Sequence, residues 1–348
     1  MSAQLTDNKL KAIPKTGSAS GPKLLDIGLT ETLIPPSPDH QLLLGFHFGN
    51  EPWDKSHDAI VSLQLQPLDR PDLFEAWWYQ GDVSFNRSGN TRVLECADYA
   101  VIIVEMEPVS AEGMRDQSRE AYFELLNATK ASNHTQLVKI WNYFGEINCG
   151  EDDSEKYRQF SIGRAEVFAE LGINDEVVPT GTAIGTKDGS GLTLIALASN
   201  HAFRPVENPR QVSAFNYPRM YGPSSPKFSR GGLVSLDNHK LFLISGTAAV
   251  VGHESNFPYD TPLQTTETFK NLTYLCEAIS NLDDIQFELD DQSILRVYLR
   301  DPADYALAVE EIEQHLGINH EQVAYLHGIV CRRELMIEID GVKVTQSR

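Results

Sequence analysis

The sequence predicts an α+β fold in which mixed β-sheets carry helices on one face. Two observations in the second half of the chain predict it. Residues 241–245 and 293–299 have the apolar character of strands, whereas residues 265–280 and 302–316 place their apolar side chains at helical spacing. Strands and helices alternating in this order are typical of helices packed on a mixed sheet. The first half repeats this outline loosely, which indicates two related half-domains.

The N-terminal half is expected to begin with hydrophobic alternation near Leu42. Residues before it are rich in Ser, Pro, Gly and Lys, which predicts a tail or strap over residues 1–40. The expected elements that follow are strands at 61–68 and 97–107, a helix at 118–132, a buried strand at 137–144, a helix at 161–172 and a strand at 193–198. The glycines of residues 179–191 predict a tight connection. We therefore divide the chain into a tail (1–40), an N-terminal half (41–200) and a C-terminal half (201–348).

The C-terminal half has clearer patterns. The helix at 265–280 is amphipathic, and Gly317 is expected to end the helix at 302–316. Two strands at 323–330 and 334–339 are predicted to close the chain. This half is expected to carry most of a functional site, for the reasons that follow.

Composition excludes several classes of protein. The chain has 348 residues, 41% of them apolar, and a net charge of −20, so it would repel nucleic acid and anionic membranes. It contains neither an apolar run of membrane-spanning length nor an apolar signal core, and its four cysteines lack metal-ligand spacing. We expect a reduced cytoplasmic protein without metal, nucleotide or other cofactor.

Arginines gather in one segment of this acidic chain, residues 208–230. Arg210, Arg219 and Arg230 lie there, with Arg204 just upstream. The planar guanidinium group matches a carboxylate with two parallel hydrogen bonds. The aromatic residues of the segment are suited to wall a small ring: Tyr217, Tyr221 and Phe228. The segment predicts a pocket for a small organic anion.

From about residue 227 to its end, the chain resembles the YjgF/Rid family of small trimeric α+β proteins. The resemblance rests on LFLISGTAAV, QTTETFKNL, LRVYLRDPADYALAVEEI and ELMIEIDGV. Members of that family are imine deaminases or binding proteins for small carboxylates. The arginine that the deaminases use on their penultimate strand has no counterpart in EQVAYLHGIV. Imine deamination is therefore not expected.

From about Leu42 onward, the chain more closely resembles the chorismatases, which build two such halves into one subunit. Its marks are WNYFGEIN, EKYRQFSIGRAEVF, PTGTAIGT, ENPRQVSAFNYPRMYGPSSPKFSR, SGTAAVVGHES and CRRELMIEIDG. The resemblance implies two YjgF/chorismate-mutase-like halves and an enzyme that releases pyruvate from the enolpyruvyl ether of chorismate. One branch of the family hydrolyses chorismate to a trans-dihydrodiol acid. Other members form 3-hydroxybenzoate, some with 4-hydroxybenzoate, and we place this chain among them.

The resemblance also implies which arginines bind the chorismate dianion. Arg219 and Arg230 match the substrate-contacting segment, and Arg164 is favoured although SIGRAEVF also allows a solvated position for it. Arg210 is expected to be structural. Tyr217 and Tyr221 are expected to contact the substrate as well, together with the small-residue segment Gly246, Thr247 and Ala248, where backbone N–H groups approach closely.

Glu338 is the expected general acid, which would protonate the vinyl methylene carbon. Alternation in ELMIEIDGV puts Glu338 on one face with Met336 and Asp340. By itself this pattern would favour a solvated glutamate, but Glu338 matches the catalytic position of the family. Glu334, four residues earlier on the same expected face, is the competing carboxylate.

Cys331 is the expected determinant of the product. In the branch that forms 3-hydroxybenzoate, a cysteine at this position is expected beside the ring. Seven residues separate it from Glu338, so a simple strand would put the two on opposite faces unless a turn intervenes near Arg332 and Arg333. An inert buried thiol is an equally weighted interpretation.

Three alternatives stay open at this point. Within the family, the alternative is hydrolysis to trans-3,4-dihydroxycyclohexa-1,5-diene carboxylate. Outside it, the alternative is a noncatalytic Rid-like binding protein for small carboxylates, which would need the arginines but not Glu338. The assembly is expected to be a homotrimer, with a monomeric pseudo-trimer as the alternative.

Overall fold

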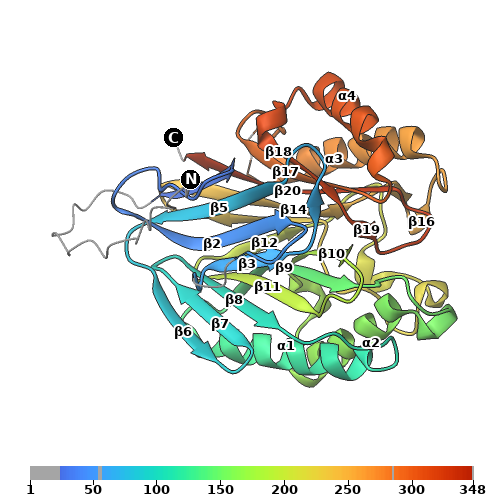
Figure 1. The fold of residues 1–348 in the computed structure, drawn as a ribbon, viewed down its shortest axis with the longest axis horizontal. Helices are drawn as coiled ribbons and strands as arrows, with labels where there is room; N and C mark the ends of the chain where they lie inside the picture. Colours follow the sequence, from blue (N-terminus) through green and yellow to red (C-terminus); the bar gives the residue numbers. More distant parts are fainter. Residues whose placement is uncertain (1–23, 54–56, 284–285, 347–348) are drawn as a thin grey trace, which may run out of the picture.

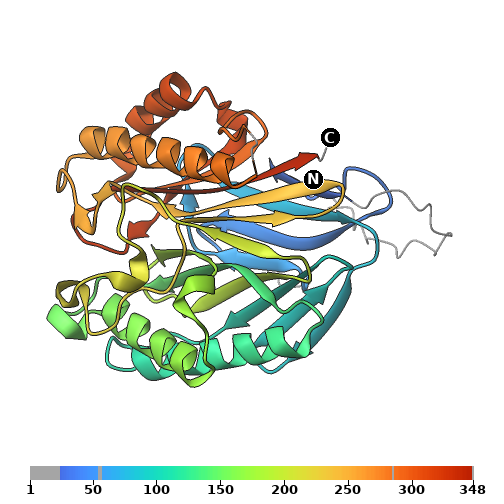
Figure 2. The same ribbon diagram turned by 180° about the vertical axis from the view of Figure 1, so that it is seen from behind.

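The chain folds around three β-sheets, with its long helices on the outside (Figures 1 and 2). The structure, a computed structural model, describes residues 24–53, 57–283 and 286–346. The smallest of the three sheets has the strand order β1 (Leu25–Thr30), β5 (Asp72–Gln80), β2 (His40–Gly49) and β3 (Ile60–Leu63). The predicted tail over residues 1–40 therefore contains an edge strand from Leu25; residues 1–23 lie outside the described residues.

Two seven-stranded sheets make up the rest of the framework. One, the N-terminal sheet, has the order β19 (Ile329–Val330), β10 (Thr180–Thr186), β9 (Gln136–Gly145), β11 (Thr193–Ser199), β8 (Tyr99–Glu105), β7 (Thr91–Glu95) and β6 (Ser84–Ser88). The other, the C-terminal sheet, has the order β12 (Phe203–Val206), β13 (Gly231–Ser235), β14 (His239–Thr247), β20 (Ile337–Gln346), β17 (Ser293–Leu299), β18 (Val323–His327) and β4 (Gln66–Pro67). A short hairpin pairs β15 (Val250–Val251) with β16 (Glu254–Ser255). Each seven-stranded sheet thus takes one short strand, β19 or β4, from the other half of the chain.

The helices cover one face of each seven-stranded sheet. Figure 1 shows α1 (Met114–Ala131) and α2 (Lys156–Glu170) beneath the N-terminal sheet, and α3 (Thr261–Asp283) and α4 (Tyr305–Leu316) above the C-terminal one. Gly317 ends α4 in the left-handed conformation, with φ of 61°. Within each sheet, parallel pairs (β9 with β10, β17 with β18) stand beside antiparallel ones. The predicted α+β class with helices on one face of mixed sheets is confirmed.

The inner faces of all three sheets share one apolar core. Phe46 from the four-stranded sheet packs edge-on against Trp141 of β9, with ring centroids 5.2 Å apart. Trp77 of β5 contacts the same ring. Leu243 and Val342 of the C-terminal sheet belong to the same buried cluster. The four-stranded sheet therefore covers apolar surface that both seven-stranded sheets would otherwise expose.

Two predicted strands differ from the structure near the end of the chain. Residues 323–330 form two strands in different sheets, because the chain leaves β18 at Gly328, where a Cβ atom would lie 2.9 Å from Ile184. The strand predicted at 334–339 begins only at Ile337 and continues to Gln346. Residues 331–335 form a turn closed by a hydrogen bond from the Leu335 N–H to the Arg332 carbonyl (3.1 Å).

The segment predicted as a tight connection is strand β10. Its glycines and threonines are typical of a loop, but here they allow close packing. A Cβ atom at Gly181 would lie 2.8 Å from Phe228, and one at Gly185 would lie 2.5 Å from Ile147. Glycine in a strand often marks such a close approach. No helix within the described ranges is long and apolar enough to cross a membrane.

Candidate active site

One cavity lies where the C-terminal sheet meets the start of α2, and it has a volume of about 240 Å³. Gly246 and Glu338 contribute to it from β14 and β20, and the turn at 331–335 and residues 217–230 close its sides. Its aromatic lining residues are Tyr157, Tyr217, Tyr221 and Phe228, and its cationic ones are Arg158, Arg230, Arg332 and Arg333. The cavity therefore combines aromatic walls with several cations in a strongly acidic protein.

Glu338 points into this cavity from a buried strand position. Its side chain is only 5% exposed, and within the described residues its carboxyl group has no hydrogen-bond or ion-pair partner. Burial, with Asp340 as the next cause, raises the pKa of Glu338 to about 8. Space for the carboxyl exists because residue 246 is glycine: a Cβ atom there would lie 1.9 Å from Glu338 Oε1. The cavity thus holds a carboxyl group that carries its proton at neutral pH.

The turn at 331–335 brings Cys331 to the same cavity as Glu338. A continuous strand would have put the two side chains on opposite faces, so the turn is what joins them. Asn148 Nδ2 donates to the Cys331 carbonyl over 2.9 Å and holds the turn against the segment that follows β9. Burial, followed by the neighbouring Glu338, raises the pKa of the Cys331 thiol to about 12. Cys331 is therefore a neutral thiol and a poor nucleophile.

Arg230 and Arg332 are the cations best placed in the cavity. Arg230 is 5% exposed, and its Nη2 donates to the Tyr217 hydroxyl (2.6 Å) and to the Val212 carbonyl (2.9 Å). Its Nε has no partner among the described residues. The guanidinium group of Arg332 lies 4.0 Å from the centroid of the Tyr221 ring. Both cations thus keep donor capacity beside the aromatic walls.

The site also contains residues that the sequence reasoning did not select. Arg332 lines the cavity, and its Nη1 donates to the His253 carbonyl (2.9 Å) and to Ser255 Oγ (3.0 Å). Arg158 and Arg333 lie at the same cavity. The signal for Arg332 was its place next to Cys331, in the segment where a turn was already suspected. Arg333 shares that signal, whereas Arg158 carried none.

Arg164 lies deeper than the lining residues, on the inward side of α2. It is 3% exposed, and its guanidinium carbon lies 5.0 Å from the centroid of the Phe160 ring. Its Nε and Nη2 have no hydrogen-bond partner in the part of the chain that the structure describes. The solvated position that its helix pattern also allowed is therefore wrong. Tyr157, two helical turns earlier on α2, lines the cavity, whereas Arg164 does not.

Arg219 and Thr247 lie away from the cavity, contrary to their predicted contact with substrate. The Arg219 side chain is 64% exposed and forms an ion pair with Asp153, with Nη1–Oδ1 at 3.0 Å. The neighbouring residues Met220 and Tyr221 line the cavity instead. Thr247 Oγ1 donates to the Ser245 carbonyl (2.8 Å), while Gly246 and Ala248 on either side of it face the cavity. In both segments the backbone conformation directs the neighbouring residues, rather than Arg219 or Thr247, toward the cavity.

The remaining candidates have structural partners. Arg210 forms an ion pair with Glu267 and donates to Asn271 Oδ1 (2.6 Å), as a structural arginine would. Glu334 lies on the turn rather than on the strand with Glu338, so the shared face predicted for the two carboxylates is wrong. Its Oε1 accepts from Ser255 Oγ over 2.7 Å at the edge of the cavity. Over the described residues, no group of three His, Cys, Asp or Glu side chains is arranged to hold a metal ion.

Comparison with known proteins adds four findings. A family model described as "Chorismatase FkbO/Hyg5-like, N-terminal" matches residues 75–198. A 3-hydroxybenzoate synthase of Streptomyces hygroscopicus is 31% identical over 238 residues, which cover 65% of this chain and 69% of the relative. A chorismatase of Streptomyces rapamycinicus is 30% identical over 279 residues, or 77% of this chain and 81% of that protein. A crystal structure of a chorismatase matches the fold with a TM-score of 0.83 at 24% identity, covering 92% of this chain and 98% of that one.

Proposed function

The chain belongs to the chorismatase family, and from that premise we propose that it cleaves chorismate to pyruvate and 3-hydroxybenzoate. The observation that carries the proposal is the protonated carboxyl of Glu338 in a cavity that also contains arginines and aromatic rings. A Rid-like binding protein would need the cations but not a buried carboxyl that holds its proton at neutral pH. The family is one of enzymes, so the binding-protein alternative is set aside.

The cations of the cavity are suited to the charge of the substrate. Chorismate carries one carboxylate on the ring and one on the enolpyruvyl arm, so its binding in an acidic protein needs local positive charge. Arg230 and Arg332 supply it at the cavity. Arg164 does not line the cavity, but a buried guanidinium with two unpaired nitrogen atoms calls for an anion, so it is proposed as the partner of a carboxylate that reaches beyond the lining residues.

Glu338 is proposed to start the reaction as a general acid. It donates its proton to the vinyl methylene carbon, which becomes a methyl group, and the positive charge moves to the ether carbon as an oxocarbenium ion. The carboxylate left on Glu338 then stabilises that cation. No water is consumed if the C4 hydroxyl displaces the ether oxygen at C3. Pyruvate leaves with the ether oxygen, and a 3,4-oxirane remains on the ring.

The second stage makes the ring aromatic and returns Glu338 to its protonated form. The oxirane opens at its C4–O bond, C3 loses its proton, and the ring becomes aromatic with its hydroxyl at C3. Opening at the C3–O bond instead gives 4-hydroxybenzoate as a minor product. Of the protons released from the C4 hydroxyl and from C3, one returns to the ring oxygen and the other to Glu338. Chorismate is thereby split into pyruvate and 3-hydroxybenzoate without any co-reactant.

Cys331 is proposed to favour this route over hydrolysis. Its neutral thiol lines the cavity beside Glu338, where a water molecule would otherwise reach the oxocarbenium carbon. A thiol is a weak hydrogen-bond partner and behaves as a small apolar group. Product choice then depends on the exclusion of water rather than on a second catalytic group.

The direct test is to mix the purified protein with chorismate, without metal or nucleotide, and to separate the products by chromatography. Pyruvate with 3-hydroxybenzoate supports the proposal. Pyruvate with a non-aromatic diol acid retains the family and Glu338 but moves the chain to the hydrolytic branch. The absence of pyruvate refutes the proposed activity.

The division of the chain at residues 40 and 200 and its assembly also stay proposals. The four-stranded sheet already covers the inner faces of both seven-stranded sheets, as the shared core of Phe46, Trp141 and Leu243 indicates. This arrangement supports the monomeric alternative over the homotrimer that we favoured from the resemblance. Sedimentation of the protein at micromolar concentration distinguishes the two.

A further inference from the structure

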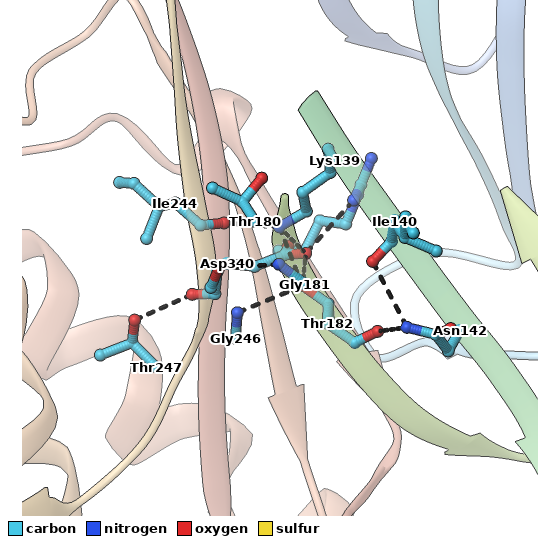
Figure 3. Close-up of polar contacts among 12 residues, drawn as sticks. Lys139, Ile140, Asn142, Thr180, Gly181, Thr182, Ile244, Gly246, Thr247 and Asp340 are labelled. Atoms are coloured by element: carbon cyan, nitrogen blue, oxygen red, sulfur yellow. Dashed lines mark hydrogen bonds and ion pairs between the residues drawn. The ribbon is translucent and has the colours of Figure 1, made fainter. Parts of the chain in front are cut away.

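A network of buried charges lies directly behind the cavity, centred on Asp340 of β20. Its Oδ2 accepts from Thr182 Oγ1 at 2.7 Å, and the Lys139 ammonium lies 3.5 Å away (Figure 3). Lys139 Nζ also donates to Thr182 Oγ1 (2.9 Å) and to the Ile244 carbonyl (2.6 Å). Asp340 and Lys139 are both fully buried. The proposed reaction has not used any of these groups.

The network continues away from the cavity and is balanced in charge. Arg296 Nη1 lies 3.4 Å from Asp340 Oδ2, and its other nitrogen atoms donate to both oxygen atoms of Glu75 (2.7 and 2.6 Å). Trp77 Nε1 adds a third donor to Glu75, at 2.7 Å. Two carboxylates and two cations thus neutralise one another in the interior. A further charge next to them would have no counter-ion of its own.

If Glu338 lost its proton, its carboxylate would be that further charge. It precedes Asp340 by two residues on β20, so both side chains project from the same face of the strand. Thr182 Oγ1 also accepts from the Gly246 N–H (3.2 Å), and it is Gly246 whose missing Cβ makes room for Glu338. The network therefore adjoins the site, although none of its donors reaches the Glu338 carboxyl in the described structure.

We propose that Asp340 is a positioning residue, whose carboxylate, paired with Lys139 and Arg296 and bonded by Thr182, keeps the proton on Glu338 until the substrate takes it. This inference rests on the proposed role of Glu338 as the acid. The physical reason is that a second carboxylate so close in a buried site strongly disfavours ionisation of the first. The hydrogen bond from Thr182 and the two cations compensate a negative charge on Asp340, whereas none of these groups bonds to the Glu338 carboxyl.

Other groups that face Glu338 act in the opposite or a weaker sense. Lys139 from β9, Arg230 from the end of the 217–230 segment and Arg332 from the turn all favour the carboxylate form and lower the pKa of Glu338, but they do not overcome burial and Asp340. The thiol of Cys331 faces it as well, and so does the phenol of Tyr157 from α2; both are neutral because their own pKa values are raised. Burial also lowers the pKa of Lys139 to about 8, against the raising effect of Asp340.

For two variants we predict shifts of opposite sign in the pH at which Glu338 loses its proton. Asp340→Asn removes the neighbouring negative charge, so Glu338 should lose its proton at lower pH. The two residues lie ~6.8 Å apart along the strand, and a unit charge at that distance in a protein interior corresponds to a shift of about 1 to 2 pH units. Lys139→Gln removes a cation that favours the carboxylate, so the same titration should move to higher pH.

The experiment reads the proton directly and needs no turnover. Infrared difference spectra of each protein against its Glu338→Gln counterpart isolate the carbonyl band of the protonated Glu338 carboxyl, which is followed from pH 5 to pH 10. In parallel, the pH at which kcat/KM for chorismate falls is measured, since a general acid is active only while protonated. Lys343→Gln is the matched control: it removes a buried lysine paired with Asp290 (2.6 Å) at the far end of β20.

The inference is supported if both readouts move down in Asp340→Asn and up in Lys139→Gln, while Lys343→Gln leaves them in place. Shifts of the same sign in both variants, or none, overturn it. If Asp340→Asn does not fold by circular dichroism, Asp340→Ser, which also removes the charge, replaces it in both measurements. If the wild-type protein releases no pyruvate from chorismate, the proposed function fails while the infrared titration still gives its answer.

Discussion

Replacement of Glu338 by Gln should remove activity and, at the same time, stabilise the fold. The variant keeps the shape of the protonated acid but has no proton to donate, so we expect turnover to fall by about 10²- to 10⁴-fold, with chorismate still bound. The gain in stability follows from linkage. A carboxyl whose pKa rises from 4.5 to about 8 on folding opposes folding once the pH exceeds 4.5, and the opposition grows until the pH passes 8.

The size of this effect can be worked out from that pKa change. With one pKa unit equal to ~1.4 kcal/mol, the wild-type carboxyl opposes folding by about 1 kcal/mol at pH 5 and about 3 kcal/mol at pH 7. Glu338→Gln should therefore gain roughly 2 kcal/mol more free energy of unfolding at pH 7 than at pH 5.

Urea unfolding of both proteins at the two pH values measures the difference. Glu310→Gln is the control, because the Glu310 side chain is exposed on α4 and should show no pH-dependent gain. A difference between wild type and Glu338→Gln that stays the same at both pH values would refute the protonated state of Glu338. Undiminished turnover of the variant would refute its role as the acid.

Four further variants test the site, with chromatography of the ring products for Cys331→Ala and steady-state assays of pyruvate release for the other three. Cys331→Ala should shift products from 3-hydroxybenzoate towards the dihydrodiol, because a smaller side chain admits water; an unchanged ratio removes Cys331 from the mechanism. Arg332→Ala should raise KM by about 10- to 100-fold through loss of a charged hydrogen bond, whereas Arg219→Ala, on the surface, should leave KM alone; equal effects would contradict the placement of the two. Gly246→Ala should lower kcat by about 10- to 100-fold, because its Cβ displaces the acid; wild-type kcat would show that the Glu338 carboxyl lies elsewhere.

Local periodicity accounts for the parts of the fold that were predicted well. The helix expected at residues 265–280 lies within α3, and the one at 302–316 contains α4, because amphipathic spacing is a property of consecutive residues. Strand β10 was missed for the opposite reason. Its glycines are dictated by Ile147 and Phe228, which belong to other elements and leave no mark in the segment itself.

The residues of the candidate site also fall into those that local motifs predicted and those that only tertiary contacts placed. Resemblance of motifs pointed to Glu338, Cys331 and Arg230, and all three meet at one cavity. Motifs could not tell which neighbour in a segment turns inward, so Arg219 was expected where the structure has Met220 beside the predicted Tyr221, and Arg332 was passed over. A single turn at 331–335 decides both the position of Arg332 and the meeting of Cys331 with Glu338.

The sequence by itself determined the α+β class, the amphipathic helices, the alternation that puts Glu338 and Asp340 on one face, and the family. Only the tertiary structure decided whether Glu338, on that face, carries a proton. Whether Glu338 holds a proton depends on burial and on charges brought from far along the chain, such as Lys139 and Arg230. Electrostatic interactions follow distance in space, and it is the packing of the N-terminal sheet against the C-terminal one that brings Lys139 within 3.5 Å of Asp340.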